Sequence, residues 1–77
     1  MELYFYEDCE YSQIVLNTIS MLKIKDKFTL KDIRLNHDYA KEIIELTGDV
    51  MFPCLVTEDD SMKEAKDIRK YINSHFL

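Results

Sequence analysis

The sequence predicts an α/β fold with the element order β-α-β-α-β-β-α, in which a four-stranded mixed sheet is flanked by three helices. Apolar, β-prone runs alternate along the chain with segments whose apolar residues recur at helical spacing. The 77 residues are 47% hydrophobic and include one Gly and one Pro, which indicates a compact, ordered fold. We therefore expect a single domain that spans residues 1–77.

The first half of the chain predicts two strands joined by a helix. Residues 3–6 form an apolar strand, and a helix is expected from Glu10 to about Leu22. Its inward stripe consists of four residues at helical spacing: Tyr11, Val15, Ile19 and Leu22. Residues 28–31 alternate as a second strand, with a bulge or an early end at Asp32. We expect these two strands to be parallel.

A second helix is expected after a cap at Asn36, His37 or Asp38. It ends at Gly48, the only glycine, where a left-handed cap is needed. Three of its apolar residues share one face: Tyr39, Ile43 and Leu46.

The last third of the chain predicts a hairpin and a helix. Pro53 cannot donate to a sheet ladder, so the third strand is expected at Cys54 to Thr57. An acidic turn leads to a short edge strand at residues 61–63. The final helix, Glu64 to Phe76, carries a stripe of four apolar residues: Ala65, Ile68, Ile72 and Phe76. Because strands one and three are apolar at successive positions, we expect helices on both faces of the sheet.

The charge excludes some function classes. A net charge of −5 and a pI near 4.8 make nucleic acid an unexpected partner, because phosphate binding needs concentrated Lys and Arg. No apolar run is long enough to span a membrane, and the acidic, aromatic start does not resemble a signal peptide. We expect a cytoplasmic monomer in which the two cysteines stay reduced.

The sharpest chemical signal is Cys9, which lies where the strand period changes to the helix period. The first backbone N–H groups of a helix have no partner inside it and favour a nearby anion, so this position favours the nucleophilic thiolate. Glu7, Asp8 and Glu10 surround the thiol with negative charge and oppose its ionisation. The alternative interpretation is a buried structural thiol at a helix start.

Ser12 stands where a C-x-x-C redox motif has its second sulfur. Because Ser12 cannot close a disulfide with Cys9, exchange would pass through a mixed disulfide that an external thiol resolves. The Ser12 hydroxyl could donate a hydrogen bond to the Cys9 thiolate. Cys54 follows Pro53 in an apolar strand, so packing is favoured over a redox role.

The element order and two motifs resemble the glutaredoxins, which have the thioredoxin fold. The resemblance covers nearly the whole chain and rests on Leu3-Tyr4-Phe5-Tyr6-Glu7-Asp8-Cys9-Glu10-Tyr11-Ser12 and on Thr47-Gly48 followed by Met51-Phe52-Pro53. It implies a glutaredoxin-like domain with Cys9 as nucleophile and a C-x-x-S site. It also implies that Tyr11 lies beside glutathione, that the Phe52 backbone pairs with its cysteinyl part, and that Pro53 is a cis-proline facing Cys9.

Residues 59–68 are similar to a segment of glutathione transferase N-terminal domains and of the two-domain bacterial glutaredoxins that resemble them. This resemblance implies that Glu64 and the Ala65 backbone hold the γ-glutamyl end of glutathione. Glu64 also begins a helix, so a plain capping role is the alternative. Tyr6 stands where many members have a basic residue, which leaves Lys41 as the nearest cation for the glycine carboxylate of glutathione.

No metal is expected, because none of the spacings among Cys9, Cys54, His37 and His75 resembles a zinc-ligand pair. Monothiol glutaredoxins that share an iron–sulfur cluster between subunits have C-G-F-S, whereas this chain has C-E-Y-S.

Two functions remain. The first is a glutathione-dependent thiol–disulfide oxidoreductase, with glutathione as co-substrate and glutathionylated or disulfide-bearing proteins as partners. The second is a protein-binding module with little catalysis, whose acidic rim around Cys9 recognises a basic surface.

Overall fold

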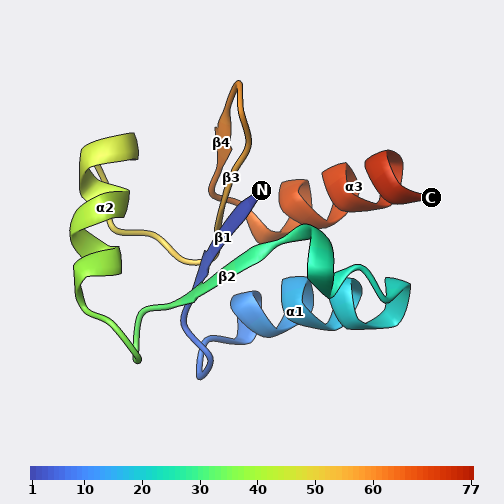
Figure 1. The fold of residues 1–77 in the computed structure, drawn as a ribbon, viewed down its shortest axis with the longest axis horizontal. Coiled ribbons are helices and arrows are strands. Elements are labelled where there is room, and N and C mark those ends of the chain that lie inside the picture. Colours follow the sequence, from blue (N-terminus) through green and yellow to red (C-terminus); the bar gives the residue numbers. More distant parts are fainter.

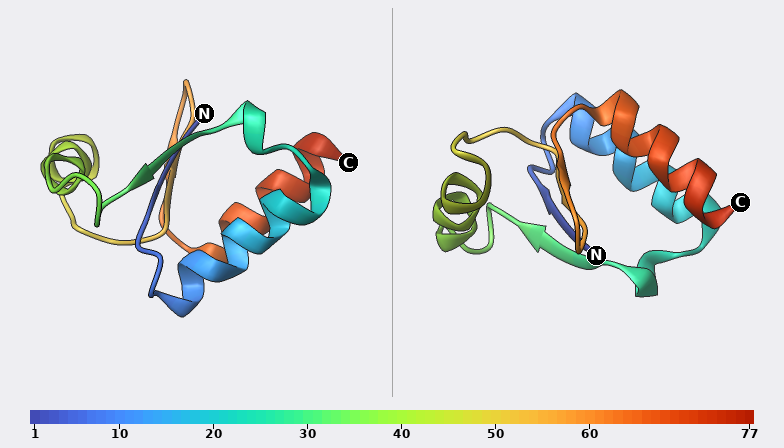
Figure 2. Two further views of the ribbon diagram at one scale, coloured as in Figure 1. Left: turned by 60° about the horizontal axis from the view of Figure 1, so that its bottom comes forward. Right: turned by 90° about the horizontal axis from the view of Figure 1, so that it is seen from above.

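The computed structural model describes residues 1–77 as three layers, with one sheet between two helical layers (Figure 1). Helix α2 covers one face of the sheet, and α1 and α3 lie side by side on the other (Figure 2). The elements are β1 (Glu2–Phe5), α1 (Glu10–Leu22), a 3₁₀ turn (Lys25–Lys27), β2 (Thr29–Asp32), α2 (Asp38–Thr47), β3 (Cys54–Val56), β4 (Ser61–Met62) and α3 (Ala65–Phe76).

The observed order and layering confirm the predicted α/β thioredoxin-like fold. The four strands are ordered β2-β1-β3-β4. As predicted, β1 and β2 are parallel, and β3 and β4 form a hairpin. The central pair, β1 and β3, is antiparallel and sets Tyr4 opposite Cys54. None of the helices combines the length and apolar character that a transmembrane span requires.

The main core lies between the sheet and the α1–α3 layer. It contains nine buried residues: Leu3, Phe5, Val15, Ile19, Phe28, Leu55, Ala65, Ile68 and Ile72. This set confirms the inward stripe of the last helix, whose fourth member, Phe76, packs against the core while partly exposed. It also explains why β1 and β3 have almost no polar residues, since their other face is covered by α2.

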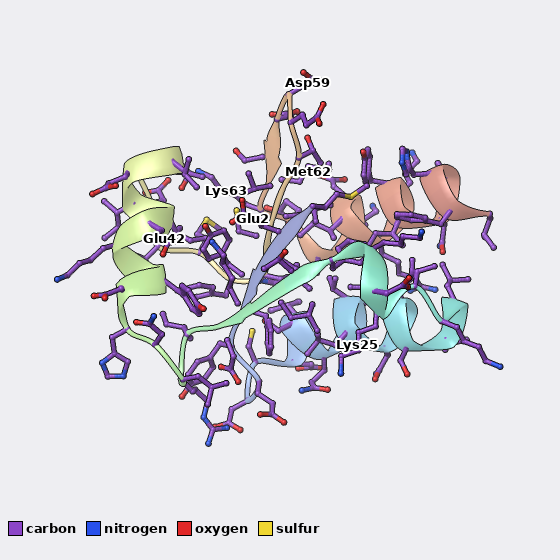
Figure 3. The ribbon with its side chains drawn as sticks, in the orientation of Figure 1. Glu2, Lys25, Glu42, Asp59, Met62 and Lys63 are labelled. Atoms are coloured by element: carbon purple, nitrogen blue, oxygen red, sulfur yellow. The ribbon has the colours of Figure 1, made fainter.

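Helix α2 rests on a much smaller core, formed by Tyr4, Ile43 and Cys54. A polar cluster beside this core adds to its attachment. Lys31 on β2 forms ion pairs with Glu2 on β1 and Glu42 on α2, and the Tyr4 hydroxyl donates to Glu42 at 2.8 Å. Figure 3 labels the two carboxylates, which come from different layers. Lys31 therefore ties both strands to the helix.

Several details differ from the sequence-based expectations. Tyr6 lies outside β1, because the ladder with β2 ends at Phe5. The early end predicted for the second strand at Asp32 is confirmed, and Leu35 beyond it is exposed. Leu46 does not share the buried face of α2, since it is 56% exposed. In α1, the side chain buried in the first turn is Ser12 rather than Tyr11, which is 62% exposed.

Two helices end in left-handed residues. Gly48 caps α2 with φ 83°, which confirms the cap predicted for the only glycine. Lys23 caps α1 with φ 56°, and the backbone N–H groups of Lys23 and Ile24 donate to the carbonyls of Ser20 and Ile19. The second cap carries strain, because a side chain in the left-handed region crowds its own backbone.

We expect Lys23→Gly to stabilise the protein by about 1 kcal/mol, since glycine adopts this conformation without steric cost. A melting temperature higher by about 4–8 °C is the corresponding change for a domain of this size. Ser20→Gly, on the exposed face of the same helix, serves as the control and should lower the melting temperature. A lower melting temperature for Lys23→Gly would contradict this expectation. It would show that the lysine side chain stabilises the fold by more than its left-handed conformation destabilises it.

We also expect the Lys31 cluster to make stability depend on acid pH. Lys31 hydrogen bonds lower the pKa of Glu2 and of Glu42 below the ordinary 4.5, so their stabilisation is present above that value and is lost as pH falls through the lowered pKa values. At neutral pH, Lys31→Met should melt about 2–5 °C below the exposed control Lys27→Met. The gap should close once both carboxyls are protonated, and a gap independent of pH would contradict this account.

Candidate active site

The strand register brings three separate segments to one end of the sheet. In the β1–β3 ladder Tyr4 is opposite Cys54, so the next pair outward is Phe5 and Pro53. In the β3–β4 ladder Leu55 is opposite Met62, so Glu64 continues opposite Pro53. The chain leaving β1 at this end turns directly into the segment that carries Cys9. The cysteine, the proline and the glutamate are thereby gathered at one edge.

Cys9 occupies the N-cap position of α1, as the change of period predicts. Its backbone is extended, with φ −82° and ψ 125°, and its N–H donates to the Tyr6 carbonyl at 2.9 Å to close a tight turn. Its carbonyl accepts from Gln13, which starts the helical ladder. The thiol is free and partly exposed, so the alternative of a fully buried structural cysteine does not describe its surroundings.

Ser12 is fully buried one helical turn after Cys9. Its hydroxyl accepts a hydrogen bond from the Tyr6 N–H at 3.2 Å. There is no hydrogen bond between Ser12 and Cys9. The hydroxyl instead stabilises the turn between Tyr6 and Cys9. The Gln13 side-chain amide also stabilises this turn, because it donates a hydrogen bond to the Glu7 carbonyl at 2.6 Å.

Pro53 is buried, and the Phe52–Pro53 peptide bond is cis. Neither the N–H nor the C=O of Phe52 has a hydrogen-bond partner within the chain. Cys54 follows as the first residue of β3 and is completely buried in the small core. Burial raises the pKa of the Cys54 thiol, an effect that the positive charge of Lys63 partly offsets. The surroundings of Cys54 thus favour packing.

A groove of about 500 Å³ runs between α1 and α3 and is lined by Tyr11, Glu64 and Ala65 among others. Tyr11 comes from the first turn of α1, and the other two come from the start of α3. Glu64 is exposed and is the N-cap residue of α3, yet its side chain makes no capping hydrogen bond. Its carboxylate is therefore available to another partner. Cys9, Ser12, Phe52 and Pro53 do not line this groove.

The charged residue that the sequence analysis missed is Arg34. It follows β2 and lies 3.3 Å from Asp8 and 3.8 Å from Glu7, measured between guanidinium nitrogen and carboxylate oxygens. Lys41, the cation expected from the sequence, is exposed on α2 and lies 4.0 Å from Asp38. The register could have revealed Arg34, because Phe5 is opposite Asp32 in the parallel ladder and Glu7 is two residues further along.

A second ion pair, between Lys63 and Asp49, lies at the end of the sheet where Pro53 and Glu64 are found. Lys63 extends from the end of β4 and donates to the Asp49 carboxylate at 3.2 Å, which connects the hairpin to the loop between α2 and β3 (Figure 3). No group of three or more His, Cys, Asp or Glu side chains is close enough to hold a metal ion. The chemistry that the gathered residues offer is that of a free, partly exposed thiol at a helix start.

Comparison with known families agrees with this geometry. The family model for the glutathione S-transferase N-terminal domain matches residues 3–76. No curated protein sequence matches the chain significantly. The matched region contains all three helices and all four strands except Glu2, the first residue of β1. It also contains the turn of Cys9, the cis-proline and the start of α3. The chain belongs to the glutathione S-transferase N-terminal domain family.

Proposed function

We propose that this chain is a single glutaredoxin-like domain that reduces glutathione mixed disulfides by a monothiol mechanism. The observation that carries the proposal is the state of Cys9, a free and partly exposed thiol at the start of the 13-residue helix α1, followed at the motif's last position by the buried Ser12. We place the reaction in the cytoplasm, where glutathione is kept reduced.

The reaction has two exchange steps. The Cys9 thiolate attacks the glutathione sulfur of a protein–glutathione disulfide, which forms a Cys9–glutathione disulfide and releases the protein thiolate. A second glutathione thiolate then attacks the glutathione sulfur of that intermediate. Oxidised glutathione leaves, and the Cys9 thiolate is restored. The net reaction converts the protein–glutathione disulfide and one free glutathione into the protein thiol and oxidised glutathione, so the reduction of the protein sulfur is balanced by the oxidation of that free glutathione.

An external thiol must resolve the intermediate because neither neighbouring residue can do so. Ser12 has no sulfur, and its hydroxyl is engaged with the Tyr6 backbone. Cys54 is completely buried, so a glutathione thiol in solution reaches Cys9 more readily than Cys54 does. Backbone N–H groups at the start of α1 stabilise the thiolate as it leaves.

The surroundings of Cys9 offer partners for the cysteinyl and γ-glutamyl parts of glutathione. The unpaired N–H and C=O of Phe52 are suited to a strand-like pairing with the cysteinyl residue. The uncapped carboxylate of Glu64 suits the γ-glutamyl ammonium, and the free N–H of Ala65 at the start of α3 suits its carboxylate. Tyr11 would contact the ligand from the α1 side of the groove, and Pro53 would shape the neighbouring position of the cysteinyl residue.

The alternative function, a binding module that uses an acidic rim, depends on unneutralised charge around Cys9. Arg34 lies against two of the three carboxylates, those of Glu7 and Asp8. The rim therefore presents less negative charge than the sequence predicts, which favours the oxidoreductase.

Replacing Cys9 tests the mechanism directly. Cys9→Ser should lose turnover of a glutathione mixed disulfide by at least about 100-fold, because a hydroxyl does not replace a thiolate as nucleophile. The assay supplies glutathione, glutathione reductase and its reductant, and Cys54→Ala is the matched control that should keep most of the activity. Mass spectrometry of the wild-type chain should detect one added glutathione, on Cys9. Equal loss in both variants, or no turnover by the wild type, would refute the monothiol proposal.

Replacing Glu64 separates ligand binding from helix capping. Glu64→Gln should raise the KM for glutathione about tenfold with little change in kcat, since one charged contact is lost. Its melting temperature should stay close to that of the wild type, because the side chain makes no capping hydrogen bond. Asp67→Asn, one turn along the same helix, is the control and should leave KM unchanged. A large fall in stability with an unchanged KM would assign Glu64 to capping instead.

A further inference from the structure

The turn that presents Cys9 is held from three directions. Ser12 and Gln13 hold its backbone from within α1, through their bonds to Tyr6 and Glu7. The third hold comes from outside the helix, where the Arg34 guanidinium lies against the carboxylates of Asp8 and Glu7. Only this third contact is ionic, so it alone changes the charge around the thiol.

Arg34 is itself held by the local structure. Its backbone N–H donates to the Asp32 side chain at 2.9 Å, and the Leu35 N–H donates to the Asp32 carbonyl at 3.0 Å. These bonds form a tight turn directly after β2. The Ile33 N–H donates to the Phe5 carbonyl, which fixes this turn beside the end of β1. The guanidinium is therefore presented from a constrained turn towards the Cys9 segment.

The charges next to Cys9 then divide into two classes. Glu7 and Asp8 share the single cation of Arg34, whereas Glu10 has no ion-pair partner. Glu10 is the first residue of α1, where a negative charge competes with the thiolate for the same helix N–H groups. Removing Arg34 would leave all three carboxylates to oppose an anion at Cys9.

We propose that Arg34 is a positioning residue of the Cys9 site, which neutralises the acidic turn and so keeps the thiol reactive. The role rests on the proposed function for its biological meaning, because it matters to exchange only if Cys9 is the nucleophile. The thiol reactivity itself is measurable without glutathione. Arg34 acts through Glu7 and Asp8 and has no recorded contact with Cys9.

The experiment measures the rate at which iodoacetamide, an uncharged electrophile, alkylates Cys9 at neutral pH and low salt, in chains that carry Cys54→Ala. Arg34→Gln should slow alkylation about two- to fourfold, and Arg34→Lys should keep most of the rate because it keeps the charge. Asp8→Asn should be faster than the parent, and the double variant Arg34→Gln with Asp8→Asn should return close to it. Lys27→Gln is the matched control, because it removes one exposed positive charge that precedes β2, at the other end of that strand from Arg34.

Two further readouts separate charge from structure. At about 0.5 M salt the differences should shrink, because exposed charges are screened over a few ångströms. The melting temperatures of the Arg34 variants should remain near that of the parent, since the side chain is exposed. An Arg34→Gln rate equal to that of Lys27→Gln, or a loss that Arg34→Lys does not rescue, would overturn the proposal. If the rates follow the expected order while the chain shows no glutathione turnover, only the proposed function fails.

Discussion

The register of β1 is the constraint on which the rest of the structure depends. This strand pairs with β2 on one side and β3 on the other, and its residues Leu3, Tyr4 and Phe5 are all buried. A slip of one residue would turn Tyr4 into the α1–α3 core and Leu3 towards α2. It would also separate the Cys9 turn from Pro53 and from Arg34. Packing on two faces therefore fixes the positions of groups that lie beyond the strand ends.

The existence and order of the elements could be predicted because they follow from local patterns. Apolar periodicity is a short-range signal, and it located α3 and its stripe correctly. The single glycine marked the end of α2, because only a left-handed residue fits there. Boundaries were less predictable. The apolar run includes Tyr6, but β1 ends at Phe5, because its hydrogen-bonded ladder with β2 ends there. Nothing in the local sequence indicates where that ladder ends.

Contacts between distant segments were outside the reach of such patterns. Lys31 lies under α2 and pairs with the carboxylates of Glu2 and Glu42, which are 29 and 11 residues away in sequence. Arg34 was missed for the same reason. Leu46 has the spacing of a core residue, but α2 meets the sheet through a small contact that leaves its later turns exposed. Burial of this kind depends on how closely two layers approach.

Ser12 shows how one position can satisfy the fold while changing the chemistry. The site inside the first turn of α1 must be small and must satisfy the Tyr6 N–H, since it is fully buried. A hydroxyl is a better acceptor than a thiol, so serine closes this turn more firmly than cysteine would. The same substitution removes the internal resolving sulfur. Any exchange at Cys9 must then admit a second glutathione, which requires an open approach, and the exposed Tyr11 at the edge of the α1–α3 groove is consistent with that requirement.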